Sequence, residues 1–150
     1  MQALKELPDW KLTIVGSRNV FQDQVKKTVK KMGIKKQVIF TGYLSDKELA
    51  KEIKSSSALV QPSLSEGFGL TGIESMSLGT PVLASDIPVF KEIYQDAVIY
   101  FDPYSVESFN KAIKKLSTNK PSSKKMKAVT NTCCWDEMVK KTISVYRSVL

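Results

Sequence analysis

The sequence predicts an α/β fold, with a Rossmann-like, doubly wound parallel sheet and helices on both of its faces. Short apolar runs alternate with amphipathic stretches, which is typical of parallel strands joined by covering helices. Gly16 and Gly42 each follow an apolar run, as expected at the carboxyl ends of strands, where open α/β sheets bind ligands. The length of 150 residues fits one domain with a sizeable core.

The expected strands and helices alternate along the chain. The predicted strands are Lys11–Val15, Gln37–Phe40, Ala58–Gln61, Pro81–Ala84 and Ala97–Phe101. The predicted helices are Val20–Met32, Asp46–Ser55, Leu70–Leu78, Val89–Tyr94, Val106–Leu116 and Trp135–Val149. Ser45 and Glu48 have the spacing of a capping box before the second helix, and Gly33 and Gly79 are expected just beyond helix ends.

Both ends of the chain are expected to depart from this alternation. Residues 1–8 resemble the end of a helix whose preceding strand is missing, so we expect a single domain over residues 1–150 that is clipped at its N-terminus. Residues 117–127 are polar and lysine-rich, which predicts a loop or a short exposed helix. The last helix is expected to pack an apolar stripe on the domain's own core, or on a neighbouring domain if one is present. This stripe consists of Trp135, Met138, Val139, Ile143, Tyr146 and Leu150.

Composition excludes several classes of function. Histidine is absent, which excludes a Ser-His-Asp triad and a histidine-based zinc site. The two cysteines are adjacent, so reduced thiols in the cytoplasm are expected. The net charge of +8 comes mostly from lysines at helical spacing, with Arg18 and Arg147 as the only arginines. This pattern favours solvated helix faces, then weak attraction to anionic lipid or phosphate-rich ligands, over specific nucleic-acid binding.

The segment between Glu66 and Glu74 is the strongest functional signal. Gly67, Gly69 and Gly72 let backbone N–H groups approach a ligand, and the helix that begins there adds free amides and the positive end of a dipole. Such a turn favours a phosphate. Carboxylates accept hydrogen bonds from hydroxyls, so the two glutamates favour a ribose or a sugar on either side. The segment therefore predicts a nucleotide-sugar site.

Other interpretations of these residues stay open at this point. The glycines also fit the Gly-x-Gly-x-x-Gly pattern of dinucleotide binding, with Asp86 at the distance expected for a ribose-binding acid. However, that pattern normally follows the first strand of its domain directly. The two glutamates could instead be ordinary acids near a helix start. Gly16 and Gly42 could be simple turn formers, and Tyr43 could stack on a base or pack on the next helix.

Taken in order, the segments resemble the C-terminal, donor-binding half of a retaining glycosyltransferase of the GT-B fold, in glycosyltransferase family 4 (the glycosyl transferases group 1 domain). The resemblance covers nearly the whole chain, and the Glu-x7-Glu spacing of Glu66 and Glu74 is its most specific part. The other matching segments are residues 12–16, 38–45, 58–63, 75–86, 87–93, 100–103 and the closing helix at 135–146.

The resemblance implies a role for each candidate residue. Glu66 would be the catalytic-site residue that binds hydroxyls of the donor sugar, and Glu74 would bind the ribose. The family's Arg and Lys that bind the diphosphate are absent from residues 1–150, and Arg18 would compensate for them in part. The remaining donor-binding residues would hold the diphosphate or line the phosphate and base pockets: Gly67, Phe68, Gly69, Leu70, Thr71, Gly16, Gly42, Tyr43 and Leu44.

The resemblance also implies an activity, namely transfer of a hexose from a UDP- or GDP-sugar to a glycan or lipid-linked acceptor, with no cofactor. It implies a role in polysaccharide biosynthesis, in the cytoplasm, with peripheral membrane association of the full-length enzyme. The acceptor would bind through an N-terminal domain that these residues lack, so the chain alone is expected to be inactive. Residues 86–90 favour a mannosyl or related donor. The alternatives are a non-catalytic nucleotide-binding or interaction module and a nucleotide-sugar epimerase-like domain.

Overall fold

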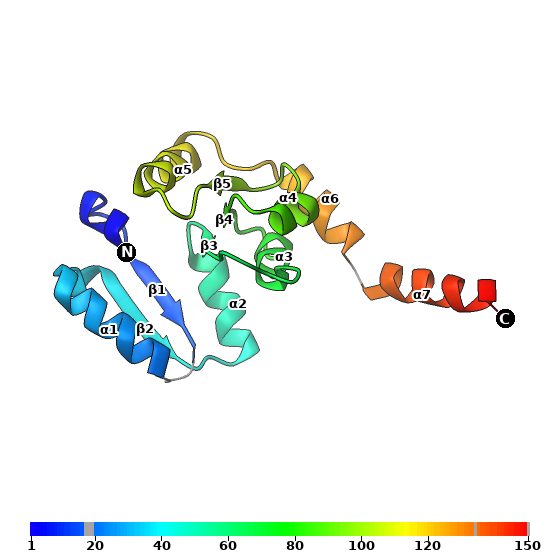
Figure 1. Ribbon diagram of the computed structural model, residues 1–150, viewed down its shortest axis with the longest axis horizontal. Coiled ribbons are helices and arrows are strands. Elements are labelled where there is room, and N and C mark those ends of the chain that lie inside the picture. The colour runs from blue at the N-terminus through cyan, green and yellow to red at the C-terminus, as the bar shows by residue number, and fades with distance from the viewer. Residues whose placement is uncertain (17–19, 134, 150) are drawn as a thin grey trace. The chain divides into compact units, whose positions relative to one another are not determined.

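The computed structural model describes residues 1–16, 20–133 and 135–149, which form two compact units, Met1–Glu52 and Ile53–Leu150 (Figure 1). Each unit contains a parallel sheet with helices packed on it, so the predicted α/β class is confirmed. The described strands are grouped into a two-stranded sheet in the first unit and a three-stranded sheet in the second.

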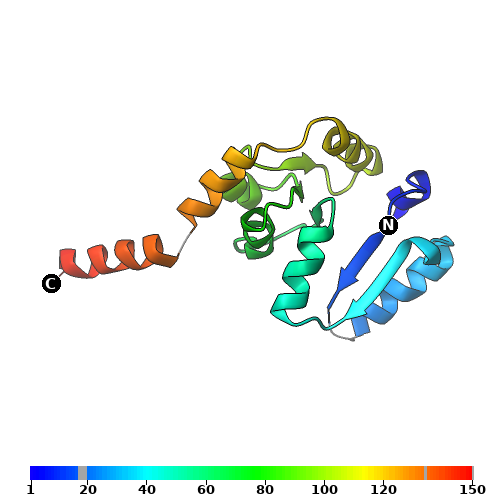
Figure 2. The same cartoon turned by 180° about the vertical axis from the view of Figure 1, so that it is seen from behind.

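The first unit contains β1 (Leu12–Val15) and β2 (Val38–Gly42), paired in parallel with Leu12 opposite Val38. Helix α1 (Val20–Met32) covers this sheet (Figures 1 and 2), and buried Val29 packs in a core with Leu4 and Val38. Two 3-10 helices complete the unit, η1 (Gln2–Glu6) and η2 (Lys35–Gln37).

One side chain ties the N-terminal segment to this unit. The Gln37 side-chain amide nitrogen donates hydrogen bonds to the carbonyl oxygens of Leu4 and Leu7, at 2.9 and 2.8 Å. It also donates to the carbonyl oxygen of Trp10 at 3.3 Å. The carbonyl oxygens of Leu4 and Leu7 also accept backbone hydrogen bonds from the N–H groups of Leu7 and Trp10. Gln37 therefore adds a second bond to each of them from a distant part of the chain.

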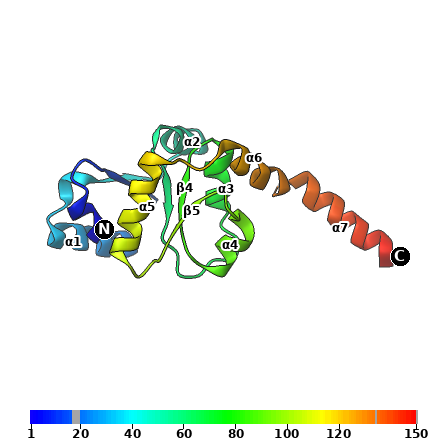
Figure 3. The same ribbon diagram turned by 90° about the horizontal axis from the view of Figure 1, so that it is seen from above.

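The second unit contains β3 (Leu59–Gln61), β4 (Val82–Ser85) and β5 (Ile99–Phe101), all parallel, with β4 in the centre. All four residues of β4 are buried, as expected for a strand covered on both faces. Helices α3 (Leu70–Ser77) and α4 (Pro88–Tyr94) lie on one face, and α5 (Val106–Thr118) lies on the other (Figures 1 and 3). Helix α2 (Asp46–Ser55) contributes residues to both units.

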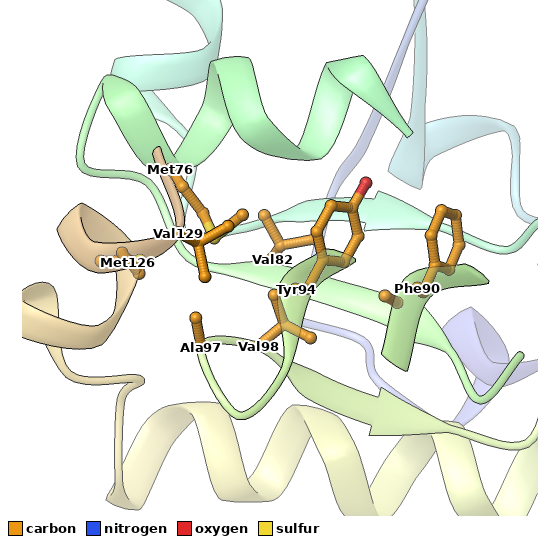
Figure 4. Packing of buried hydrophobic residues seen from close by; sticks show 9 residues of the cluster. Met76, Val82, Phe90, Tyr94, Ala97, Val98, Met126 and Val129 are labelled. Atoms are coloured by element: carbon orange, nitrogen blue, oxygen red, sulfur yellow. The ribbon is translucent and has the colours of Figure 1, made fainter. Parts of the chain in front are cut away.

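The core of the second unit lies between the sheet and its helices α3, α4 and α6 (Figure 4). Phe90 and Tyr94 of α4 are completely buried, and their rings stack with centroids 5.0 Å apart. The other buried members of this cluster are Met76, Val82, Ala84, Ala97, Val98, Met126 and Val129.

The predicted helix ends agree with the structure. Glu48 accepts hydrogen bonds from the backbone N–H and the hydroxyl of Ser45, at 2.9 and 2.6 Å. These two bonds lower the pKa of Glu48. The bond from the backbone N–H is one of the two bonds of a capping box. Gly33 and Gly79 follow α1 and α3, as predicted.

Two expectations for the C-terminal region need correction. Residues 117–127, predicted to be a loop or a short exposed helix, contain the end of α5 and the start of helix α6 (Ser123–Thr132). Helix α6 buries Met126 and Val129, whose spacing of three residues places them on one helix face. Helix α7 (Trp135–Val149) was expected to pack its apolar stripe on the domain's own core, but none of its described residues is buried, and Trp135 and Tyr146 are exposed. The alternative, packing on a neighbouring domain, stays a prediction. Leu150 lies outside the described residues.

Candidate functional site

The glycine turn consists of residues 67–72. It lies at the end of the loop that follows β3, and it includes the first residues of helix α3. Gly69 is the N-cap and has a φ of +88°, a left-handed conformation that favours glycine. No side chain in the described part of the chain caps this helix end. The N–H of Gly72 donates to the carbonyl oxygen of Gly69 at 3.0 Å. The amides of Leu70 and Thr71, at the first turn, are therefore in the place where an anion binds a helix N-terminus.

The two glutamates stand on either side of this turn in the sequence and differ in their surroundings. Glu66 is half-buried, and its carboxylate accepts a hydrogen bond from the hydroxyl of Ser63 at 2.8 Å. Glu74 lies on α3 and is exposed. An exposed carboxylate is hydrated, so Glu74 does not need the protein partner that a carboxylate against an apolar face would need.

Tyr94 lies directly beneath the glycine turn, with its hydroxyl directed toward α3 (Figure 4). The single proton of this hydroxyl is shared between two acceptors, the side-chain oxygen of Gln61 at 2.7 Å and the carbonyl oxygen of Gly69 at 2.5 Å. Burial raises the pKa of Tyr94 to about 12, and the nearby charge of Glu66 acts in the same direction. The phenol is therefore neutral, and able to donate, at neutral pH.

The approach of Tyr94 explains why residues 69 and 72 are glycines. A Cβ atom at Gly69 would lie 2.2 Å from the Tyr94 hydroxyl oxygen, and one at Gly72 would lie 2.3 Å from it. A Cβ at Gly72 would also lie 2.4 Å from the side-chain oxygen of Gln61. Since these distances are far below van der Waals contact, the turn and Tyr94 can pack this closely only without side chains at these positions.

Sequence reasoning missed three residues that shape this site, Gln61, Ser63 and Tyr94. Gly69 and Gly72 are spaced by three residues, which places them on one face at the start of a helix. That spacing was a signal that a large group packs against this face, but it does not identify which residue supplies the group.

The candidate residues of the first unit lie at the carboxyl ends of its two strands. The N–H of Gly16 donates to the carbonyl oxygen of Gly42 at 3.0 Å, which joins the carboxyl ends of β1 and β2. Tyr43 is 79% exposed, so its ring does not pack on the next helix. Leu44 is half-buried. Arg18 lies outside the described residues.

The described residues contain no cluster of three or more His, Cys, Asp or Glu side chains that could hold a metal ion. Within the same ranges, no helix combines the length and the apolar character needed to cross a lipid bilayer. Asp86, the candidate ribose-binding acid of the dinucleotide interpretation, forms an ion pair with Lys91 at 2.6 Å.

Comparison with known proteins agrees with the predicted resemblance. Residues 1–131 match the family described as Glycosyl transferases group 1. The O-antigen chain mannosyltransferase RfbU of Salmonella typhimurium is 36% identical over 107 residues, which are 71% of this chain and 30% of that protein.

Two solved structures share the fold. Sucrose-phosphate synthase from Thermosynechococcus elongatus superposes with a TM-score of 0.86 at 22% identity, over 98% of this chain and 40% of that one. Alr3699/HepE from Anabaena, solved in complex with UDP and glucose, superposes with a TM-score of 0.73 at 19% identity, over 99% of this chain and 44% of that one. The chain thus spans less than half the length of these three proteins. Its α/β fold is that of part of a GT-B glycosyltransferase, and the chain belongs to the glycosyl transferases group 1 family.

Proposed function

We propose that this chain is the donor-binding part of a retaining hexosyltransferase, which transfers a hexose from a UDP- or GDP-sugar to a glycan or lipid-linked acceptor. Membership of the glycosyl transferases group 1 family supports the transferase class. The name of the Salmonella relative, a mannosyltransferase, supports a hexosyl donor, and the Anabaena structure with UDP and glucose supports a nucleotide-sugar ligand.

The observation that carries the proposal is the start of α3, which lies between two glutamates in the sequence and is capped by no side chain among the described residues. In the proposed complex the diphosphate accepts hydrogen bonds from the amides of Leu70 and Thr71. Hydrogen bonds to a charged group contribute about 1.5–3 kcal/mol each. The helix dipole adds to this stabilisation, and it acts most strongly on the charge that develops on the leaving diphosphate.

The two glutamates have separate proposed roles. Glu66 accepts hydrogen bonds from hydroxyls of the donor sugar, and its bond to Ser63 fixes the direction of its carboxylate. Glu74, exposed on α3, accepts hydrogen bonds from the ribose hydroxyls. The nucleotide sugar is a substrate in this proposal, and neither a cofactor nor a metal is invoked for its binding.

The acceptor is proposed to bind through a part of the longer relatives that residues 1–150 do not match. Positioning two reactants in one site contributes about 7–11 kcal/mol to the lowering of a barrier. We therefore expect the 150-residue chain to bind nucleotides without measurable sugar transfer.

The test is calorimetric titration of the chain with UDP, GDP, UDP-glucose and GDP-mannose. We expect binding of one nucleotide series, and a loss of about tenfold in affinity for Glu74→Ala, since a hydrogen bond to a charged group is removed. Glu107→Ala is the matched control, because Glu107 is also an exposed glutamate near a helix start but lies on α5, across the sheet from α3 (Figure 3).

The proposal is wrong if the wild-type chain binds none of the four compounds. Equal binding by wild type and Glu74→Ala would refute the ribose role alone.

A further inference from the structure

We propose that Tyr94 is a positioning residue, which holds the glycine turn in the conformation that presents the Leu70 and Thr71 amides to a diphosphate. This inference rests on the proposed function, because it assumes that the diphosphate binds at this turn. Tyr94 does not contact the ligand in this proposal. It acts through Gly69, because its hydroxyl donates a hydrogen bond to the Gly69 carbonyl oxygen from the side of the turn opposite to the proposed ligand.

The first support is the number of independent constraints on the Tyr94 side chain. Its ring is completely buried and stacks on Phe90, with 15° between the ring planes. Its hydroxyl is bound to the side chain of Gln61, at the end of β3. Since α4 and β3 both hold the phenol, its oxygen is a fixed point to which the turn is attached.

The second support is the bond to the turn itself. Gly69 has a left-handed backbone and no side chain, so its peptide groups have more rotational freedom than those of other residues. The Tyr94 hydroxyl donates to the Gly69 carbonyl oxygen at 2.5 Å, and the N–H of Gly72 donates to that same oxygen. That carbonyl belongs to the peptide unit whose N–H is the Leu70 amide. Fixing the oxygen therefore fixes the direction in which the Leu70 N–H points.

The third support is steric. The Tyr94 hydroxyl fills the space in which side chains at positions 69 and 72 would lie. The turn consequently packs against a rigid oxygen. Removing that oxygen leaves a gap under the turn, and the peptide at Gly69–Leu70 gains freedom to rotate, which weakens a preorganised anion site.

Tyr100 offers a matched control within the same unit. Its hydroxyl proton is likewise shared between two acceptors, the carbonyl oxygens of Phe90 and Gln95, at 3.0 and 2.6 Å. These bonds connect β5 to α4 and do not involve the glycine turn. Tyr100→Phe therefore removes comparable hydrogen bonds but leaves every hydrogen bond of the Tyr94 hydroxyl to the glycine turn in place.

The experiment compares wild type, Tyr94→Phe and Tyr100→Phe, all as the 150-residue chain. Calorimetric titrations with UDP, GDP, UMP and GMP are run at a temperature where circular dichroism shows all three proteins to be folded. We expect Tyr94→Phe to weaken diphosphate binding about three- to tenfold, because the variant loses the hydrogen bond that holds the Gly69 carbonyl in place. We expect monophosphate binding to change less, and Tyr100→Phe to bind all four nucleotides as wild type does.

A measurement on the wild-type chain covers the case in which Tyr94→Phe does not fold. On addition of the nucleotide that binds, the NMR resonances of the Tyr94 ring are expected to shift together with the Leu70 and Thr71 amides, because Gly69 connects them. The resonances of the Tyr100 ring are expected to stay in place.

The outcomes separate this inference from the proposed function. If wild type binds no nucleotide, the proposed function is wrong, and the inference about Tyr94 is wrong as well. If wild type binds while Tyr94→Phe binds diphosphates equally well, or loses mono- and diphosphate affinity to the same extent, Tyr94 has only a structural role. Nucleotide binding that shifts the Leu70 and Thr71 amides but leaves the Tyr94 ring unshifted overturns the inference in the same way.

Discussion

The end of β2 and the turn before α3 both contain a glycine with a left-handed backbone, yet the surroundings of the two glycines differ. Gly42 has a φ of +76° and nothing within 4 Å of the position of an added Cβ. Gly69 has a φ of +88°, and an added Cβ would meet both Tyr94 and Phe90. The first glycine is therefore required by its backbone alone, and the second by its backbone and its packing. Glycines that look equivalent in the sequence should respond differently to the same substitution.

Gly69→Ala should have the largest effect, because strain and overlap act together. A left-handed alanine costs about 1–2 kcal/mol, and overpacking of a rigid core adds about 1–3 kcal/mol. The added Cβ would lie 2.8 Å from a ring carbon of Phe90 as well as against the Tyr94 hydroxyl. Urea unfolding monitored by circular dichroism measures the loss. A loss no larger than that of Gly42→Ala would show that the packing contributes nothing.

Gly72→Ala isolates the packing contribution, since the backbone of Gly72 is not left-handed. Within a helix, Gly to Ala normally stabilises by about 0.5–1 kcal/mol. Here the added Cβ overlaps the Tyr94 hydroxyl and the Gln61 side chain, so we expect destabilisation of about 1–3 kcal/mol instead. The sign of the change in unfolding free energy decides the matter. Thr71→Ala, at the exposed neighbouring position of the same helix, is the control and should change stability little.

Gly42→Ala isolates the backbone contribution. The added methyl group meets open space, so only the left-handed conformation is strained, at about 1–2 kcal/mol. Gly42→Asn should recover part of this loss, because asparagine tolerates the left-handed region better than alanine does. Thermal unfolding of the two variants measures the difference, and equal stabilities would argue against backbone strain as the cause.

The same comparison shows what could be predicted from the sequence. The alternation of apolar runs predicted the α/β class, and the spacing of Ser45 and Glu48 predicted a helix start, because both are local patterns. The glycine turn was also recognisable locally. Tyr94 was not, because its contact with Gly69 joins residues 25 positions apart, and nothing in the α4 sequence specifies which turn it meets.

The two C-terminal helices show a related limit. Apolar periodicity identified a stripe along α7, but it cannot identify what covers that stripe, and Trp135 is 77% exposed. In α6 the opposite occurred, because Met126 and Val129 are the only strongly apolar residues in a lysine-rich segment and both are buried. Two apolar residues at the right spacing suffice for packing on α3 and the sheet, even when the average composition is polar.

Tyr94, which packs against Gly69 and not against Gly42, also makes the free energy of unfolding depend on pH. Burial raises the pKa of Tyr94 from 10.0 to about 12, so the folded state holds its proton more tightly than the unfolded state does. This stabilising contribution is fully present below pH 10 and is lost as the pH rises through 12. Near pH 11 the loss should be about 1 kcal/mol. Unfolding free energies of wild type and Tyr94→Phe, measured from pH 9 to pH 11, should therefore converge as the pH rises. A constant difference between the two proteins would contradict this.

Gln95→Gly should have the smallest effect and the opposite sign. Gln95 is the only non-glycine residue with a positive φ in the described part of the chain, with φ +50° and ψ −124°. Gln95 is the C-cap of α4 and follows Tyr94 directly. Its carbonyl oxygen accepts a hydrogen bond from the Tyr100 hydroxyl, and this contact helps to hold the backbone conformation in place. A strained backbone of this kind costs about 1–3 kcal/mol, which glycine relieves. Glycine also loses about 0.4–1 kcal/mol through the greater freedom of the unfolded chain. We therefore expect a net gain of about 0.5–1 kcal/mol in thermal or urea unfolding. Gln95→Ala keeps the Cβ atom and should give no such gain, so equal stabilisation by both variants would show that backbone strain at this position is not its source.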